Sequence, residues 1–368
     1  MGHGTQTRLR GMCIIMVVLG HSVLQIFQEA SFNEQIVLVT IAKFCAPSLL
    51  IFVFLIGYGQ GRKKHRIRRS ELSQRFQQLM IPYLIWASIA FLFYLLIESP
   101  YRYTLVGEAF ITQQPYIIRY LFSISTFTIS MQYYFLPVLF FFHWYAYMIR
   151  IQSEYLMLLI FKYVFIVQWL FLLSVSLFAW FVSPEQMDFG ILGGGFLYRN
   201  FLVWGTFFYI GYVMGACKRA SFPDLKHKGI LFLFLWAISA TEMIYVINRS
   251  ADTFVTDMFT LFGVLFAMIS LLVWLSVAEK TEEGRSASIF PWAGKVFMLF
   301  GKYSFVVFLL HLPFQWYILV LLEFMAGYTF SIFARLAILF FSGIGFPYTV
   351  INMSRRIKPM LRRKLIGF

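Results

Sequence analysis

The first apolar stretch of the chain carries two ionisable residues, Arg10 at its start and His21 inside it. Ionisable side chains inside a membrane span are costly, so they are candidates for function. The two residues are 11 positions apart, which at 3.6 residues per turn is almost three whole turns. We therefore expect Arg10 and His21 to share one helix face about 16 Å apart, with Arg10 at the cytoplasmic surface and His21 near mid-membrane.

This spacing matches a long ligand that has an anionic head and a reactive tail. A guanidinium binds phosphate through two parallel hydrogen bonds, and an imidazole exchanges a proton near neutral pH. Coenzyme A thioesters have this shape, with phosphates at one end and the thioester at the other. His21 could then take the proton of an attacking sugar hydroxyl and return it to the departing thiolate. The alternative is a structural histidine that only hydrogen-bonds a neighbouring helix.

The composition requires helices that lie in a membrane. Of the 368 residues, 60% are hydrophobic and 13% are charged, whereas soluble domains are about half apolar and about a quarter charged. A helix crosses the hydrocarbon layer with about twenty mostly apolar residues. Runs of suitable length lie near residues 11–27, 35–59, 80–97, 132–149, 155–182, 201–216, 230–247, 254–277, 300–322 and 330–348. The shorter stretch 117–128 is rich in hydroxyl groups, so we expect it to lie at the interface or to re-enter.

The basic residues orient these spans. With both termini in the cytoplasm, most of the 31 Lys and Arg lie on the cytoplasmic side, as the positive-inside rule requires. Arg102, Arg199 and Arg249 then fall on the outer side. We predict an all-α polytopic membrane protein of about ten transmembrane helices, with both termini cytoplasmic. It forms a single integral-membrane domain over residues 1–368, with a basic cytoplasmic tail at 353–368.

Several other classes of protein have little support in the sequence. The net charge of +15 follows from the membrane orientation, so no nucleic-acid partner is expected. Cys13, Cys45 and Cys217 have no paired spacing, which argues against a disulfide frame or a zinc site, and no metal is expected. A Gly-x-Ser-x-Gly elbow and a His-Glu-x-x-His motif are missing, which disfavours a hydrolase or a metalloprotease. A covalent acyl-enzyme on a Ser or Tyr stays open.

Five stretches of the chain, in order, resemble the acyltransferase-3 family, the integral-membrane enzymes that O-acylate bacterial surface polysaccharides. Arg10, ten further residues and His21 resemble the signature of its first span. Residues 48–58 resemble its second-span run ending in Gly and an aromatic, and residues 75–83 its basic loop entering a Pro-aromatic helix start. Residues 133–140 are similar to its Trp-Phe-Leu segment, and 301–311 to its penultimate-span Ser-to-His pattern. The resemblance covers nearly the whole chain.

The resemblance implies an activity and a location. An acyl group, acetyl or succinyl, passes from cytoplasmic acyl-CoA to a hydroxyl of a surface or lipid-linked polysaccharide in the inner membrane of a bacterium. Arg10 and His21 are implicated in catalysis or donor handling. The expected partners are the lipid bilayer, acyl-CoA (acetyl-CoA first), the carbohydrate acceptor and the machinery of polysaccharide synthesis or export. No permanently bound cofactor is expected.

Further positions are assigned by the same resemblance. Arg75 matches the first of a pair of arginines that the family often carries three apart, but the second position is Gln78. Donor binding is therefore assigned to Arg75 with Arg68 and Arg69, or the loop only fixes the topology. His311 and Tyr134 are assigned to substrate contact. For His311 the alternative is an imidazole that is satisfied by a neighbouring helix.

The competing prediction from another class is a multi-span transporter or flippase of polysaccharide precursors, since such proteins also use buried ionisable residues. They tend to contain paired Gly- or Pro-broken helices in two related halves. The sequence shows no such pairing, and the spacing of Arg10 and His21 has no counterpart in the second half. An acyltransferase is therefore favoured.

Overall fold

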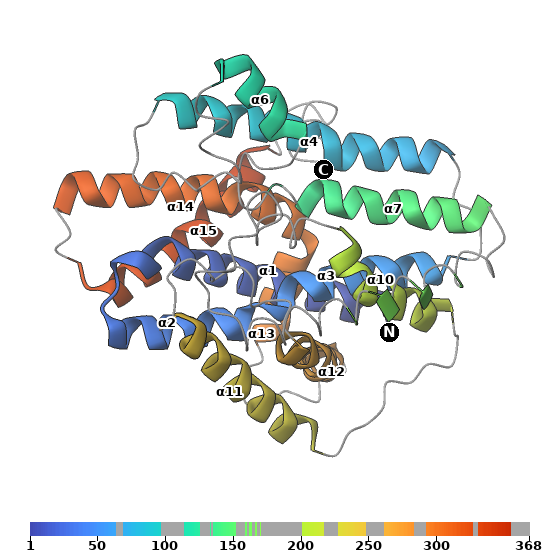
Figure 1. Ribbon diagram of the computed structural model, residues 1–368. Helices are drawn as coiled ribbons and strands as arrows, with labels where there is room; N and C mark the ends of the chain where they lie inside the picture. Colours follow the sequence, from blue (N-terminus) through green and yellow to red (C-terminus); the bar gives the residue numbers. More distant parts are fainter. Residues whose placement is uncertain are drawn as a thin grey trace. The chain divides into compact units, whose positions relative to one another are not determined.

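The computed structural model describes residues 1–63, 69–96, 114–125, 133, 135–151, 201–216, 227–247, 261–282, 292–326 and 330–354, with 159, 162–163, 166–167 and 170. The regular structure of these residues is helical and contains no β-strand (Figure 1). The predicted all-α class is therefore confirmed. The chain divides into two compact units, each built from separate segments of the sequence.

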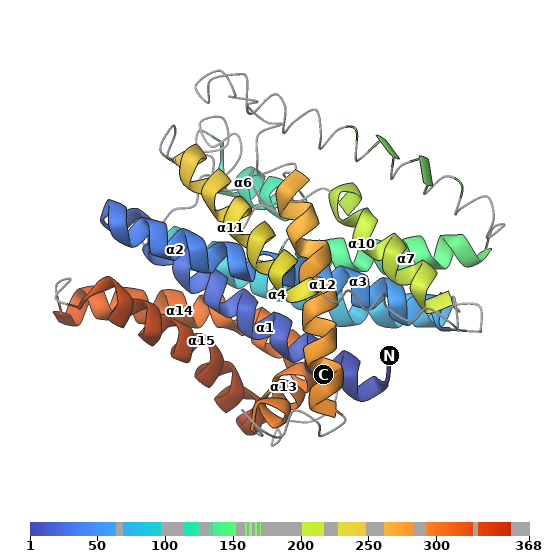
Figure 2. The ribbon, with the colours of Figure 1, turned by 90° about the horizontal axis from the view of Figure 1, so that it is seen from below.

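The first unit comprises Met1–Phe52, Ser221–Asn248 and Leu261–Ile357. Its helices are α1 (His3–Ile26), the short 3-10 helix η1 (Phe27–Glu29), α2 (Phe32–Cys45), α11 (Lys228–Ile247), α12 (Leu261–Glu282), α13 (Ala293–Lys302), α14 (Ser304–Ala326) and α15 (Ile332–Ser354). Helix α1 contacts α2, α12, α13, α14 and α15, and Figure 2 shows it between α2 and the pair α14 and α15. The helix that carries Arg10 and His21 is thus the centre of this unit.

The start of α2 and the junction after it follow from local sequence. Glu34 closes a capping box, because its carboxylate accepts hydrogen bonds from the Ser31 backbone N–H (2.8 Å) and from the Ser31 hydroxyl (2.6 Å). Helix α3 (Pro47–Gly61) begins directly after Ala46. Proline suits the first turn of a helix, where its missing N–H would have no helical partner.

The second unit comprises Val53–Ala220, Arg249–Thr260 and Lys358–Phe368. Its described helices are the C-terminal part of α3, α4 (Arg69–Leu96), α6 (Tyr116–Ser125), α7 (Phe135–Ile151) and α10 (Phe201–Ala216). Helix α4 contacts α6 and α7, and α7 contacts α10. The rings of Phe142 and Phe208 stack with their centroids 4.9 Å apart, which joins α7 to α10 through aromatic packing.

Four glycines allow α3 and α10 to pack backbone against backbone. They are Gly57 and Gly61 on α3, and Gly211 and Gly215 on α10. A Cβ on any of the four would lie well inside van der Waals distance of a carbonyl oxygen of the other helix. Small residues four apart are typical of close helix packing in membranes. Gly59 differs, since its Cβ position has no heavy atom within 4 Å.

Several helices have the length and hydropathy of membrane spans. Among the described residues, His3–Ile26, Phe32–Gly61, Ser304–Leu322 and Ile332–Met353 are long and apolar enough to cross a membrane. Shorter apolar helices cover Phe135–Met148, Lys228–Thr241 and Leu265–Glu279. The chain therefore has the character of a multi-pass membrane protein. The count of about ten spans and the side on which the termini lie stay predictions, because the stretch 155–182 falls mostly outside the described residues.

Some predicted boundaries need correction. The run at 300–322 is not one helix, since α13 ends at Lys302, α14 begins at Ser304, and Tyr303 lies between them. The separate α13 contacts α1 closely, because Gly11 and Gly301 bring the two backbones together. The described part of the stretch 117–128 lies in α6, whose 10 residues make a helix of only about 15 Å, and its predicted place at the interface is not tested. Most of the predicted tail at 353–368 falls outside the described residues, and the single-domain prediction is not tested.

Candidate functional site

Helix α1 contains both Arg10 and His21 without a break. The continuous helix gives the two side chains the shared face expected from their spacing. The same face turns toward α14 in the C-terminal half of α1, where His21, Ser22 and Gln25 each contact a residue of α14. Both Arg10 and His21 are partly exposed. The described residues therefore do not fully enclose either side chain.

His21 forms a pair with His311 of α14. The Nδ1 atom of His21 lies 2.7 Å from the Nε2 atom of His311. The two rings are nearly parallel, with an interplanar angle of 8° and centroids 5.1 Å apart. His311 is completely buried. Two residues that are 290 positions apart in the chain thus form a single imidazole dyad.

The partners of His311 fix the direction of the hydrogen bonds in the dyad. Its Nδ1 atom lies 3.0 Å from the carbonyl oxygen of Val307 and 2.9 Å from that of Phe308. Carbonyl oxygens only accept, so Nδ1 of His311 carries the proton and donates. In a neutral ring Nε2 is then the acceptor, which makes Nδ1 of His21 the donor across the 2.7 Å contact.

This arrangement leaves Nε2 of His21 with a lone pair. A neutral imidazole with one nitrogen held as a donor presents its other nitrogen as a proton acceptor. The backbone carbonyls behind His311 therefore orient the basic atom of His21 through two successive hydrogen bonds. A base that is held by a second group in this way is the arrangement found where a hydroxyl is activated as a nucleophile.

A buried layer of amide groups lies one helical turn from the dyad. Nε2 of Gln315 donates to the Ser22 hydroxyl (2.6 Å) and lies 3.3 Å and 3.2 Å from the carbonyl oxygens of Val18 and Leu339. Nε2 of Gln25 donates to Oε1 of Gln315 at 3.2 Å. Neither Gln25 nor Gln315 was predicted from the sequence as part of the site. The signal was present, since each follows a histidine by four residues in an apolar helix and so lies on the same face.

An ion pair joins the short helix η1, which follows α1, to the start of α15. Nη1 of Arg335 at the start of α15 lies 2.6 Å from a carboxylate oxygen of Glu29 in η1. The exposed fractions of the two side chains are 7% and 24%, so water screens the pair only in part. The contact stabilises α15 against the end of α1, beyond the dyad and the amide layer.

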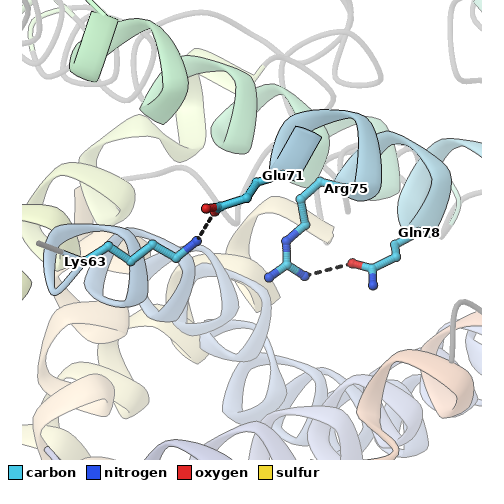
Figure 3. A network of polar contacts seen from close by, with 4 residues as sticks. All are labelled: Lys63, Glu71, Arg75 and Gln78. Atoms are coloured by element: carbon cyan, nitrogen blue, oxygen red, sulfur yellow. Dashed lines mark hydrogen bonds and ion pairs between the residues drawn. The ribbon is translucent and has the colours of Figure 1, made fainter. Parts of the chain in front are cut away.

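Arg75 was expected in a basic loop that enters a helix, but the structure places it inside α4, in the second unit. Figure 3 shows Lys63 in an ion pair with Glu71 (2.9 Å) and Arg75 donating to Oε1 of Gln78 (3.0 Å). The ion pair is well exposed, and such pairs contribute little to stability. Gln78 thus accepts a hydrogen bond from Arg75 at the position where the family often has its second arginine. A guanidinium has five N–H donors, so Arg75 has others that a ligand could use.

The other residues expected at the site are placed as follows. Arg69 is an exposed residue at the start of α4, while Arg68 and Tyr134 fall outside the described residues. His311 was expected to contact substrate, but both of its ring nitrogens contact protein atoms, which favours a supporting role behind His21. The described part of the chain holds no group of three or more His, Cys, Asp or Glu that could bind a metal.

Comparison with known proteins gives one match. A family model described as an acyltransferase domain, Acyl_transf_3, matches residues 8–352. The matched region includes Arg10, His21, Arg75, and the amide layer on α1 and α14. No curated protein and no solved structure matched the chain.

Proposed function

The chain belongs to the acyltransferase-3 family, and on this premise we propose that it transfers an acyl group from acyl-CoA to a hydroxyl of a surface or lipid-linked polysaccharide. The acyl group is acetyl, with succinyl as the alternative. Membership of the family and the apolar helices make the chain a multi-pass membrane acyltransferase. The proposal adds the donor, the acceptor and the residues that perform the reaction.

The observation that carries the proposal is the dyad of His21 and His311. It supplies a base, Nε2 of His21, whose proton-accepting state is set by hydrogen bonds within the protein. His21 is the partly exposed member of the pair, and His311 is the buried one. This difference assigns proton transfer to His21 and orientation to His311.

The reaction follows from this assignment. Nε2 of His21 takes the proton of the acceptor hydroxyl while the hydroxyl oxygen attacks the thioester carbonyl carbon. The tetrahedral intermediate collapses, the carbon–sulfur bond breaks, and the departing sulfur takes the proton back from His21. The products are an ester on the carbohydrate and free coenzyme A, and the imidazole returns to its neutral form.

The arginines serve the donor. Arg10 lies about 16 Å along α1 from His21, a distance that the pantetheine arm of coenzyme A can span. A guanidinium at that point binds a phosphate of the donor through parallel hydrogen bonds. Arg75, with Arg68 and Arg69, is proposed to bind donor phosphate as well. The donor would enter from the cytoplasm, while the acceptor would approach the other end of α1.

The entry of donor and acceptor from opposite sides of the membrane goes with the predicted topology. That topology is about ten spans in the bacterial inner membrane, with both termini cytoplasmic. Reporter fusions test the topology. A fusion after Lys226 should give a cytoplasmic signal, and one near Gly194 should give an external signal. A cytoplasmic signal at Gly194 would contradict the span count.

The test of the activity is transfer in a defined system. The purified protein is reconstituted in liposomes with isotope-labelled acetyl-CoA inside and polysaccharide fragments outside, and the fragments are analysed by mass spectrometry. We expect labelled ester on the fragments and free thiol inside. Succinyl-CoA in place of acetyl-CoA identifies the preferred donor. Thiol release without labelled fragments would contradict the acceptor, and neither product would contradict the proposed function.

A further inference from the structure

We propose that Gln315 is a positioning residue, which sets the distance between His21 and His311 by joining three helices through one buried amide. The catalytic part of this inference rests on the proposed function. The geometric part concerns only the packing of α1, α14 and α15, and it can be tested without any acyl transfer.

The hydrogen bonds of Gln315 reach both neighbouring helices. Its amide nitrogen contacts Ser22 Oγ and the Val18 carbonyl oxygen on α1, and the Leu339 carbonyl oxygen on α15. Its amide oxygen accepts from Gln25, again on α1. The side chain is completely buried. A buried amide that loses its hydrogen-bond partners lowers the stability of the fold. A displacement of α14 along α1 would break these hydrogen bonds, so the contacts of Gln315 oppose it.

The register ties this amide layer to the dyad. His21 pairs with His311, and four residues later Gln25 pairs with Gln315. Both pairs have the same separation of 290 positions, so the two helices run parallel and in step. One turn rises about 5.4 Å, so the amide layer lies about one turn beyond the dyad along both helices. A shift that breaks the glutamine contacts also moves the two imidazoles apart.

Gly343 on α15 supplies independent evidence. A Cβ at this position would lie 2.6 Å from Nε2 of Gln315 and 2.8 Å from Cγ1 of Val18. Both distances are shorter than non-bonded contacts allow. Helix α15 thus approaches the amide only because residue 343 lacks a side chain. The amide is enclosed by α1 on one side and by α15 on the other.

The geometric test measures the spacing of α1 and α14 directly. In a background without Cys13, Cys45 and Cys217, His21→Cys and His311→Cys are joined by a short bifunctional thiol reagent in native membranes. A protease site placed in residues 283–291 separates the two helices into fragments, so that only cross-linked chains stay together on a gel. Gln315→Leu is then added to this double-cysteine protein.

We expect Gln315→Leu to reduce cross-linking severalfold. Gln60→Leu is the matched control, because it removes a buried amide from α3 and should leave cross-linking unchanged. Gly343→Ala is a second perturbation for the case that Gln315→Leu fails to accumulate. It keeps the glutamine but pushes against its amide, so it should reduce cross-linking in the same direction.

The catalytic test uses the native histidines. Gln315→Leu should lower kcat about tenfold, equivalent to one lost hydrogen bond, and should leave the KM for acyl-CoA unchanged at equal protein abundance. Normal cross-linking in both Gln315→Leu and Gly343→Ala would overturn the inference, and so would reduced cross-linking with unchanged kcat. If the unmodified protein transfers no acyl group, the proposed function fails, while the cross-linking still decides whether Gln315 sets the spacing.

Discussion

Replacing His311 by phenylalanine should slow acyl transfer and leave the protein folded. The ring keeps a similar size in a site that is completely buried, but Nδ1 of His21 loses its hydrogen-bond acceptor at 2.7 Å. An unsatisfied buried donor costs about 1–3 kcal/mol, and about 1.4 kcal/mol corresponds to a tenfold change in rate. We therefore expect kcat to fall about 5- to 150-fold. The KM for acyl-CoA should stay the same, because His311 exposes no atom to a ligand.

The assay is the release of coenzyme A thiol in the presence of acceptor, with kcat and KM measured at matched protein concentration. His143→Phe is the control, since Nδ1 of His143 lies 2.8 Å from the Leu139 carbonyl oxygen of its own helix and should have no part in the reaction. In the double variant with His21→Gln, the change at His311 should add nothing further, because both residues act as one unit. Full activity in His311→Phe, or independent losses in the double variant, would refute the assignment of orientation to His311.

Three further substitutions test other parts of the structure. Arg10→Lys keeps the charge but loses the guanidinium fork, so turnover should fall while a reporter fusion at the N-terminus still gives a cytoplasmic signal. Arg75→Gln should raise the KM for acyl-CoA about 10- to 100-fold by removing a charge-assisted contact, and an unchanged KM would return the loop to a purely topological role. Gly211→Leu should lower the melting temperature of the detergent-solubilised protein, because overpacking costs about 1–3 kcal/mol, whereas Gly59→Ala at an open position should not.

The sequence predicted the features that depend on local periodicity. Apolar runs identified most of the helices, and 3.6 residues per turn placed Arg10 and His21 on one face of the first helix. The capping box at Ser31 and Glu34 is also encoded locally, although it was not among the predictions. These features are contained in windows of a few turns, so neighbouring residues in the chain are enough to reveal them.

The sequence could not predict which helices pack together. The contact between His21 and His311 joins segments 290 positions apart. Hydrophobic periodicity shows that each of the two helices contains a polar position, but it does not show that the two positions meet. For the same reason the sequence did not predict the contact between Gln315 and Gly343. A glycine in a span indicates that another helix lies close, but it does not show which helix that is. The boundary at Tyr303 was missed for another reason. Lys302 and Ser304 flank this residue, but a charged and a hydroxyl side chain are also common where a single span begins, so hydropathy alone did not separate α13 from α14.

Acylation of surface polysaccharide by a His21→Gln variant tests the central claim most directly. Glutamine keeps a hydrogen-bonding group but cannot exchange a proton near neutral pH, and loss of a general base typically lowers the rate about 10² to 10⁴-fold. Polysaccharide from cells with equal amounts of each protein is analysed by mass spectrometry for ester groups. We predict that His21→Gln abolishes detectable acylation while the protein still inserts in the membrane. Near-normal acylation would contradict the proposed mechanism, and unaltered polysaccharide in a full deletion would favour a transporter instead.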